Sequence, residues 1–332
     1  MADGILIGGS PSTGSSALVH ILNRHPALLA GPETYLFMHP GLYTDWERHK
    51  TYLLKTSKFG GLKSRGWFKM NGADLLQPFY GQSTTSLLHL IAEADTFSHF
   101  AGAYFQSALQ KAGARIWVEK SPSNALCFDH FLHIFPEGKV VHTTRDPYDA
   151  IASLVARGLS PFSATAFYLI NTAFAIKKAE DSRYHLLKYE EWVASPEKVL
   201  KPLLQSLGLK WRADLIRPEA GEEVRMEGWL HNEKAALSTR SIGRFYQLTD
   251  EQQRHITCAV RQMRINPRYR KVYGLEVGSI QDLCAALGYP EKPSVGHVCS
   301  QLKMARLAAR FFRLTRFYPH WGRCFPITLS GT

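Results

Sequence analysis

The chain has 332 residues, of which 45% are hydrophobic and 20% charged, and it carries a formal net charge of +12 at pH 7. This composition is typical of a folded globular protein and excludes the disordered class, and no apolar run approaches the roughly 20 residues that span a bilayer. The five cysteines are scattered without a C-x-x-C pair, which excludes a disulfide framework and a zinc site and predicts reduced, mostly buried thiols: Cys127, Cys258, Cys284, Cys299 and Cys324.

The first predicted element is a short strand that runs into a loop and a helix. Residues 4–16 read GILIGGSPSTGSS, and the apolar spacing that follows predicts a helix over about 17–22. Backbone N–H groups at a helix N-terminus favour phosphate or sulfate, and Ser15 and Ser16 add hydroxyl donors. The glycine spacing matches a Walker A motif, but Ser15 stands where its lysine would be. We expect an anion site that is not an ordinary NTPase site; a plain Gly-rich turn is the alternative.

The second predicted strand covers 27–30 and ends at a Gly-Pro turn followed by Glu33. Ligands of open α/β sheets bind at the carboxyl ends of the strands, so we expect Glu33 to lie near the anion loop.

Residues 42–79 lose periodicity and are rich in aromatic side chains. We interpret them as an irregular substrate-binding or lid region around Gly60 and Gly61, although packing of a second subdomain predicts the same pattern equally well. The aromatic residues are Tyr43, Trp46, Tyr52, Phe59, Trp67, Phe68, Phe79 and Tyr80.

Strands and helices then alternate as far as Gly208. One or two helices are predicted over 87–108, followed by strands near 115–119, 140–143 and 184–189, with helices near 147–157, 165–179 and 196–207. This order predicts an α/β fold, a P-loop-like parallel β-sheet flanked by helices. We expect one domain over 1–290, with the substrate-binding region at 42–112 and a helical C-terminal part. The later helices are expected from the Thr249 cap to Ile265 and over 280–287.

The last segment, 291–332, is basic and amphipathic. Its charged residues after Pro290 are Glu291 against Lys292, Lys303, Arg306, Arg310, Arg313, Arg316 and Arg323. We expect the segment to pack on the domain, and its helical stretch 302–317 could instead close the substrate cleft, form a homodimer or touch a membrane. Nucleic acid is not an expected partner, and a solvated basic helix is the plainest alternative.

Three motifs in this order resemble the family of sulfotransferases that use 3′-phosphoadenosine 5′-phosphosulfate. The motifs are the first loop, the Arg-Asp-Pro segment with a serine eight residues after its arginine, and a strand ending in Tyr-Glu-Glu; the resemblance covers 4–209 and, more weakly, 241–245. It implies that the loop binds the 5′-phosphosulfate, that Arg145, Ser153 and Arg244 bind the 3′-phosphate, and that Tyr189 lies near the nucleotide. The loop residues concerned are Ser12, Thr13, Gly14, Ser15 and Ser16.

The resemblance also implies catalytic residues. Glu33, in Gly-Pro-Glu-Thr, matches the base that takes the acceptor's proton, and Lys120, in Glu-Lys-Ser-Pro, matches a cation that contacts the transferring group. Structural alternatives stay open: Glu33 could cap a helix or pair with an arginine, and Lys120 could pair with Glu119 or Glu33. The alternative partners of Arg145 are Asp146 and Asp149.

Ser12 departs from the family pattern, in which lysine or arginine follows the loop proline. Losing such a transition-state contact costs on the order of 3 kcal/mol. We expect Lys120 to substitute for the missing cation; another basic residue, or a protein that binds nucleotide without fast transfer, are the alternatives.

The expected function is sulfuryl transfer to a hydroxyl, or an amine, of a small-molecule acceptor such as a natural product, without a metal. Because the first strand begins about four residues from Met1, we expect a cytoplasmic protein. The alternatives are a kinase-like phosphotransferase with a degenerate P-loop, which would need ATP and Mg²⁺, and a nucleotide-binding pseudoenzyme or basic interaction protein.

Overall fold

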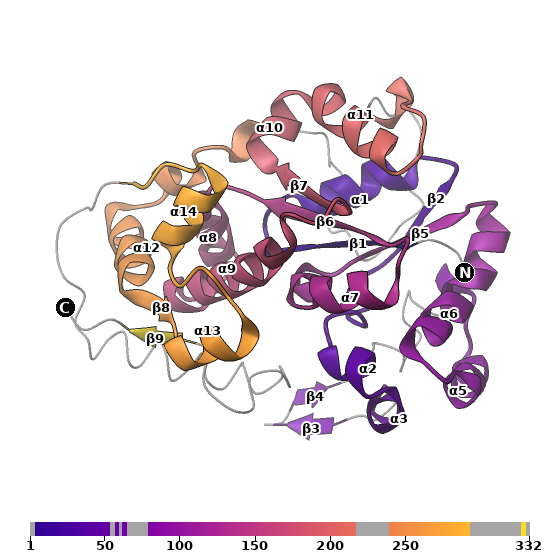
Figure 1. Cartoon of the computed structure of the whole chain (residues 1–332). Helices are drawn as coiled ribbons and strands as arrows, with labels where there is room; N and C mark the ends of the chain where they lie inside the picture. The colour runs from indigo at the N-terminus through magenta and orange to yellow at the C-terminus, as the bar shows by residue number, and fades with distance from the viewer. Residues whose placement is uncertain are drawn as a thin grey trace.

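A five-stranded parallel sheet forms the centre of the protein (Figure 1). The computed structural model describes residues 4–53, 57–59, 62–64, 79–216, 239–292 and 327–329. The strand order is β2-β5-β1-β6-β7, and the strands are β1 (Gly4–Gly9), β2 (Leu28–Ala30), β5 (Ile116–Lys120), β6 (Lys139–Thr144) and β7 (Tyr184–Lys188). All five coincide with stretches predicted as strands, so the α/β fold with a parallel sheet is confirmed.

The middle strand, β1, is buried at all six positions between β5 and β6. Ile5 and Ile7 belong to the apolar cluster on one face of the sheet, and Leu6 belongs to the cluster on the other. Such alternation between two covered faces is why an uninterrupted apolar run forms the centre of a parallel sheet.

Helices cover both faces of the sheet (Figure 1). The first face packs against α1 (Ser15–Asn23), α10 (Tyr189–Ala194) and α11 (Pro196–Ser206). The second face carries an aromatic cluster around Trp117, whose ring stacks on Phe105 with the centroids 4.6 Å apart. The helices there are α2 (Pro40–Thr44), α3 (Trp46–His49), α5 (Thr84–Glu93), α6 (Phe97–Ala112) and α7 (Phe128–Ile134).

A third apolar cluster joins the helices that follow β6 to the helical C-terminal part. It contains α8 (Pro147–Ala156), α9 (Pro161–Ala175), α12 (Asp250–Gln262), α13 (Pro267–Tyr273) and α14 (Ile280–Leu287). The remaining elements are two strand pairs, β3 (Ser57–Phe59) with β4 (Leu62–Ser64) and β8 (Met263–Ile265) with β9 (Ile327–Leu329), and the 3₁₀ turns η1 (Lys50–Tyr52), η2 (Pro122–Cys127), η3 (Ile176–Lys178), η4 (Ala213–Leu215), η5 (Thr239–Ser241) and η6 (Arg244–Gln247).

The described part of the segment 42–79, for which the sequence predicts an irregular region, contains short regular elements. Proline at the first turn of α2 and the Asp45 cap of α3 set two short helices, each too brief to show a period in sequence. The Trp46 indole donates to Ala94 O at 2.6 Å and the Tyr80 hydroxyl donates to Pro32 O at 3.1 Å. These aromatic side chains pack in the core.

Two helix boundaries also differ from the prediction. The helix from the Thr249 cap ends at Gln262 rather than Ile265, because residues 263–265 form β8 and pair with β9. The α9 helix begins at Pro161 rather than Thr165, where the Ser160 hydroxyl accepts from the Ser163 N–H at 3.1 Å.

Several predicted features lie outside the described residues. They are the stretch 302–317, the basic tail beyond Lys292 except β9, the aromatics Trp67 and Phe68, the pair Gly60 and Gly61, and the thiols Cys299 and Cys324. The other three cysteines, Cys127, Cys258 and Cys284, are buried, as predicted. Within the described ranges, no helix has the length and apolar character to cross a membrane.

His142 on β6 makes stability depend on pH. Its Nδ1 lies 2.6 Å from the Tyr184 hydroxyl, and burial lowers the pKa of the ring from 6.5 to about 3. Between these values the unfolded chain binds a proton that the folded protein excludes. His142 therefore costs no stability above pH 6.5. On acidification below that value it lowers the free energy of unfolding by up to about 1.4 kcal/mol per pH unit.

We expect His142→Gln to show a shallower fall of unfolding free energy between pH 6.5 and 5 than the wild type. Urea titrations at several pH values measure this slope. An unchanged slope would contradict the prediction.

Candidate functional site

The loop between β1 and α1 has a backbone shape that neighbouring elements fix. Gly14 caps α1 with a φ of 87°, and a Cβ there would lie 2.6 Å from Cδ2 of Tyr189. The Thr13 hydroxyl donates to Ser10 O at 2.8 Å and lies 2.8 Å from Thr143 Oγ1 on β6. The loop is thus anchored to the sheet, with the amide groups of the first turn of α1 at its end.

A carboxylate and an ammonium group meet beside the start of α1. Lys120, the last residue of β5, donates from Nζ to Glu33 Oε1 and to Ser16 Oγ, the latter at 3.2 Å. The Lys120 side chain is only 2% exposed, against 22% for Glu33. Glu33 therefore lies near the loop, as predicted, and Lys120 joins it to Ser16.

Glu119 anchors the turn that carries Glu33. It is fully buried, and Oε1 accepts from the Thr34 N–H at 2.8 Å, the Thr34 hydroxyl at 2.9 Å and the Ser121 hydroxyl at 2.8 Å, while Oε2 accepts from Asn124. Burial raises the pKa of the Glu119 carboxyl, and these hydrogen bonds act to lower it. The network fixes the position of Glu33 relative to β5, a role that the sequence analysis did not assign.

Arg145, which follows β6, joins three segments that are far apart in sequence. Its Nη1 donates to Ser12 O at 3.2 Å, its Nη2 donates to Ser241 O, and its Cζ lies 4.8 Å from the centre of the Tyr189 ring. Burial lowers the pKa of the guanidinium, and the positive charge of Arg244 acts in the same direction. The loop between β1 and α1, the 3₁₀ turn η5 and the first residue of α10 therefore meet at Arg145.

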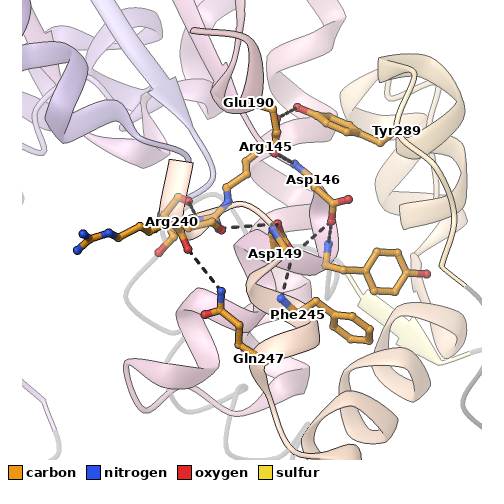
Figure 2. Close-up of polar contacts among 12 residues, drawn as sticks. Arg145, Asp146, Asp149, Glu190, Arg240, Phe245, Gln247 and Tyr289 are labelled. Carbon is orange, nitrogen blue, oxygen red and sulfur yellow. Dashed lines mark hydrogen bonds and ion pairs between the residues drawn. The ribbon is translucent and has the colours of Figure 1, made fainter. Parts of the chain in front are cut away.

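Asp149 anchors the late loop, which we define as residues 239–247 (Figure 2). Its buried carboxylate accepts from the Gly243 N–H at 2.6 Å and from the Phe245 N–H at 3.0 Å, and lies 4.0 Å from Nη2 of Arg145. Asp149 thus holds the backbone around Arg244 and is not only a counter-ion of Arg145.

Asp146 and Glu190 hold the start of α8 (Figure 2). Asp146 accepts from the Tyr148 and Asp149 N–H groups at 2.9 and 3.1 Å. Glu190 accepts from the Asp146 N–H at 2.9 Å and from the Tyr289 hydroxyl at 3.1 Å. Residues just after α14 are thereby tied to the segment that carries Arg145.

Lys292 is a second internal cation of this cluster, beside Arg145. Its side chain is 8% exposed, and Nζ lies 3.2 Å from Oδ1 of Asp146 and 3.4 Å from Oδ1 of Asp149. Nζ also lies 4.7 Å from the centre of the Tyr246 ring. The sequence analysis grouped Lys292 with the basic tail, and no local pattern distinguishes it from the other cations there.

Two arginines have a buried donor atom that fits an anion. Nε of Arg145 and Nε of Arg244 are buried and have no hydrogen-bond partner among the described residues. Buried donors normally have acceptors, and arginine forks suit phosphate oxygens. The residues present therefore fit a phosphate group between the loop and the late segment.

Arg157, which caps the end of α8, also reaches the loop. Its Nη1 donates to the Ser12 hydroxyl at 3.2 Å, and the residue is exposed. The sequence analysis missed it, although its spacing of four residues from Ser153 on one helix is a signal that both side chains share a face.

The structure gathers most of the predicted site residues into two neighbouring groups along one loop. Ser16 is beside Glu33 and Lys120, whereas Ser12 and Gly14 are beside Arg145 and Tyr189. The other predicted residues are Thr13, buried against β6; Ser15, the buried first residue of α1; Ser153, partly buried on α8; and Arg244, the first residue of η6.

Comparison with known proteins gives a family, one curated relative and a similar structure. Residues 4–213 match the sulfotransferase family. Nodulation protein NoeE of Sinorhizobium fredii (strain NBRC 101917 / NGR234) is 27% identical over 154 residues, which are 46% of this chain and 31% of that protein, so the match spans about a third of the relative. The sulfotransferase domain of the olefin synthase of Synechococcus PCC 7002 has a TM-score of 0.53 and 20% identity, covering 74% of this chain and 88% of that chain, and it shows the same fold.

Proposed function

The chain belongs to the sulfotransferase family, and we propose that it transfers a sulfuryl group from 3′-phosphoadenosine 5′-phosphosulfate to a hydroxyl, or an amine, of a small-molecule acceptor. The observation that carries the proposal is the meeting of Glu33 and Lys120 at one end of an anion loop whose other end contacts Arg145. A base, a cation and an anion site at one edge of the sheet are what such a transfer requires.

In this proposal the donor binds along the loop. The N–H groups at the start of α1 and the hydroxyls of residues 12–16 bind the 5′-phosphosulfate. Arg145, Ser153 and Arg244 bind the 3′-phosphate, beside Tyr189. The buried Nε donors of both arginines support this assignment, because phosphate oxygens would supply their acceptors.

The proposed chemistry uses Glu33 as the base. Glu33 accepts the proton of the acceptor hydroxyl while the acceptor oxygen bonds to sulfur. The bond between sulfur and the 5′-phosphate oxygen breaks, and its electron pair leaves with adenosine 3′,5′-bisphosphate. Lys120 orients Glu33 through their contact and places positive charge beside the transferring group.

The remaining parts of the chain receive roles that follow from this proposal. We propose one domain over 1–290, an acceptor site within 42–112, and packing of the segment 291–332 on the domain. A homodimer and a cytoplasmic location belong to the same proposal.

Calorimetric titration with adenosine 3′,5′-bisphosphate, beside ATP with Mg²⁺, tests the proposal on wild type and Arg145→Ala. We expect micromolar bisphosphate binding and weak ATP binding in the wild type. The variant should lose about a hundredfold in bisphosphate affinity, because it removes charge-assisted bonds to phosphate.

The matched control is Arg115→Ala. Arg115 is exposed, donates from Nη2 to Gly208 O at 3.1 Å and precedes β5, at the opposite end of that strand from Lys120. No bisphosphate binding, or a preference for ATP, would replace the proposal with the kinase-like alternative. Bisphosphate binding that survives Arg145→Ala would contradict the proposed 3′-phosphate site.

A further inference from the structure

The 5′ end of the donor site lacks a cation within the loop itself. Residues 10–16 read SPSTGSS and contain no basic side chain. Lys120 lies nearby, but its ammonium contacts the Glu33 carboxylate, and the proposed function places it beside the transferring sulfuryl group rather than beside the leaving phosphate. A leaving group that gains negative charge at this loop therefore needs a positive charge from another element.

The structure assigns this role to Arg157: we propose that its guanidinium binds the 5′-phosphosulfate of the donor and stabilises the charge that the leaving phosphate gains. The inference rests on the proposed function and concerns the same site. Its geometric basis is the hydrogen bond of 3.2 Å from Nη1 of Arg157 to the hydroxyl of Ser12.

The position of Arg157 on α8 supports the assignment. Asp149, Ser153 and Arg157 follow one another at intervals of four residues, so their side chains lie along one face of the helix. Asp149 holds the late loop with Arg244, and Arg157 reaches the first loop. One helix face thus runs from the proposed 3′-phosphate site to the proposed 5′ site.

Two arginines donate hydrogen bonds to Ser12. Arg145 donates to its carbonyl oxygen and Arg157 to its hydroxyl, each at 3.2 Å. Arg145 is 3% exposed and fixed by further contacts, whereas Arg157 is exposed and holds a neutral hydroxyl. A bond to a neutral acceptor is weaker than one to an anionic oxygen, so Arg157 gains by turning its donors to the phosphosulfate.

A pair of nucleotides that differ only at the 5′ position tests the inference. Adenosine 3′,5′-bisphosphate carries the 5′-phosphate, and adenosine 3′-monophosphate lacks it. Calorimetry on Arg157→Ala should show about a tenfold or greater loss of affinity for the bisphosphate and no change for the monophosphate. Arg145→Ala should weaken both ligands.

Two further variants separate charge from structure. Arg157→Lys keeps the positive charge and should retain most of the bisphosphate affinity, whereas Arg157→Gln should behave like the alanine variant. The control Arg115→Ala should leave both affinities unchanged. Equal losses for the two nucleotides in Arg157→Ala, no loss at all, or a lysine variant as weak as the alanine variant would overturn the inference.

Failure of the inference is distinguishable from failure of the proposed function. A wild-type protein that binds neither nucleotide, or binds both without need of Arg145, removes the proposed donor site altogether. A wild-type protein that binds the bisphosphate through Arg145 and is insensitive to Arg157→Ala keeps the donor site and overturns only the role of Arg157.

Discussion

Replacing Glu33 by glutamine is expected to lower kcat for sulfuryl transfer by about 10²- to 10⁴-fold, the usual contribution of a general base. Glutamine keeps an oxygen near the Lys120 ammonium but does not accept the acceptor's proton. Affinity for adenosine 3′,5′-bisphosphate should change little, because Glu33 contacts Lys120 rather than the loop itself. The measurement is bisphosphate release from the donor, with the best acceptor found for the wild type in a screen of phenols and alcohols.

The control for Glu33→Gln is another glutamate that pairs with lysine. Glu47 accepts from Lys50 at 2.6 Å on the surface, where its side chain is 68% exposed. Glu47→Gln should transfer sulfuryl at the wild-type rate. A wild-type rate in Glu33→Gln as well would exclude Glu33 as the base and leave its contact with Lys120 as an ordinary ion pair.

Replacing Asp149 by alanine is expected to lower the unfolding free energy by about 3 to 5 kcal/mol, the range found when one partner of a buried ion pair is removed. The change leaves the Lys292 ammonium and the N–H groups of Gly243 and Phe245 without this buried acceptor. Urea unfolding measures the loss. Release of the late loop should also weaken bisphosphate binding, since Arg244 is held between those two amides.

Asp149→Asn and an exposed aspartate serve as comparisons. The asparagine variant keeps one acceptor oxygen and should lose less stability than the alanine variant. Asp214 pairs with Arg212 at the surface, where both side chains are about half exposed, and Asp214→Ala should produce no measurable change. If Asp149→Ala were as stable as Asp214→Ala, the anchoring role of Asp149 would be wrong.

The centre of the sheet could be predicted from sequence because β1, β2 and the start of β5 are apolar and buried on both faces. These runs end at turn or polar residues, which mark the carboxyl edge of the sheet. This reasoning placed Glu33 near the loop without any coordinates. The pairing of β8 with β9 could not be predicted in this way, because it joins Ile265 to Ile327 across a long stretch of chain.

The parts of the site that escaped prediction depend on contacts between distant segments. Asp149 was considered only as a partner of Arg145, but its main contacts are backbone amides beyond residue 240. Lys292 looked like one more basic residue of the tail, although two aspartates near the start of α8 surround it. Spacing along one helix could have indicated Arg157, but its contact with Ser12 depends on the tertiary fold.

The contacts of Tyr289 and Lys292 affect how deletions of the basic tail should be designed and interpreted. Any truncation that begins before residue 293 removes Lys292, an internal counter-ion of Asp146 and Asp149. One that begins before residue 290 also removes the Tyr289 hydroxyl that donates to Glu190. Loss of nucleotide binding in such a protein would report damage to the contacts that hold Arg145 and the segment around Arg244, not the loss of a polyanion-binding surface. Substitutions of the basic residues beyond Lys292 that keep both Lys292 and β9 separate the two functions.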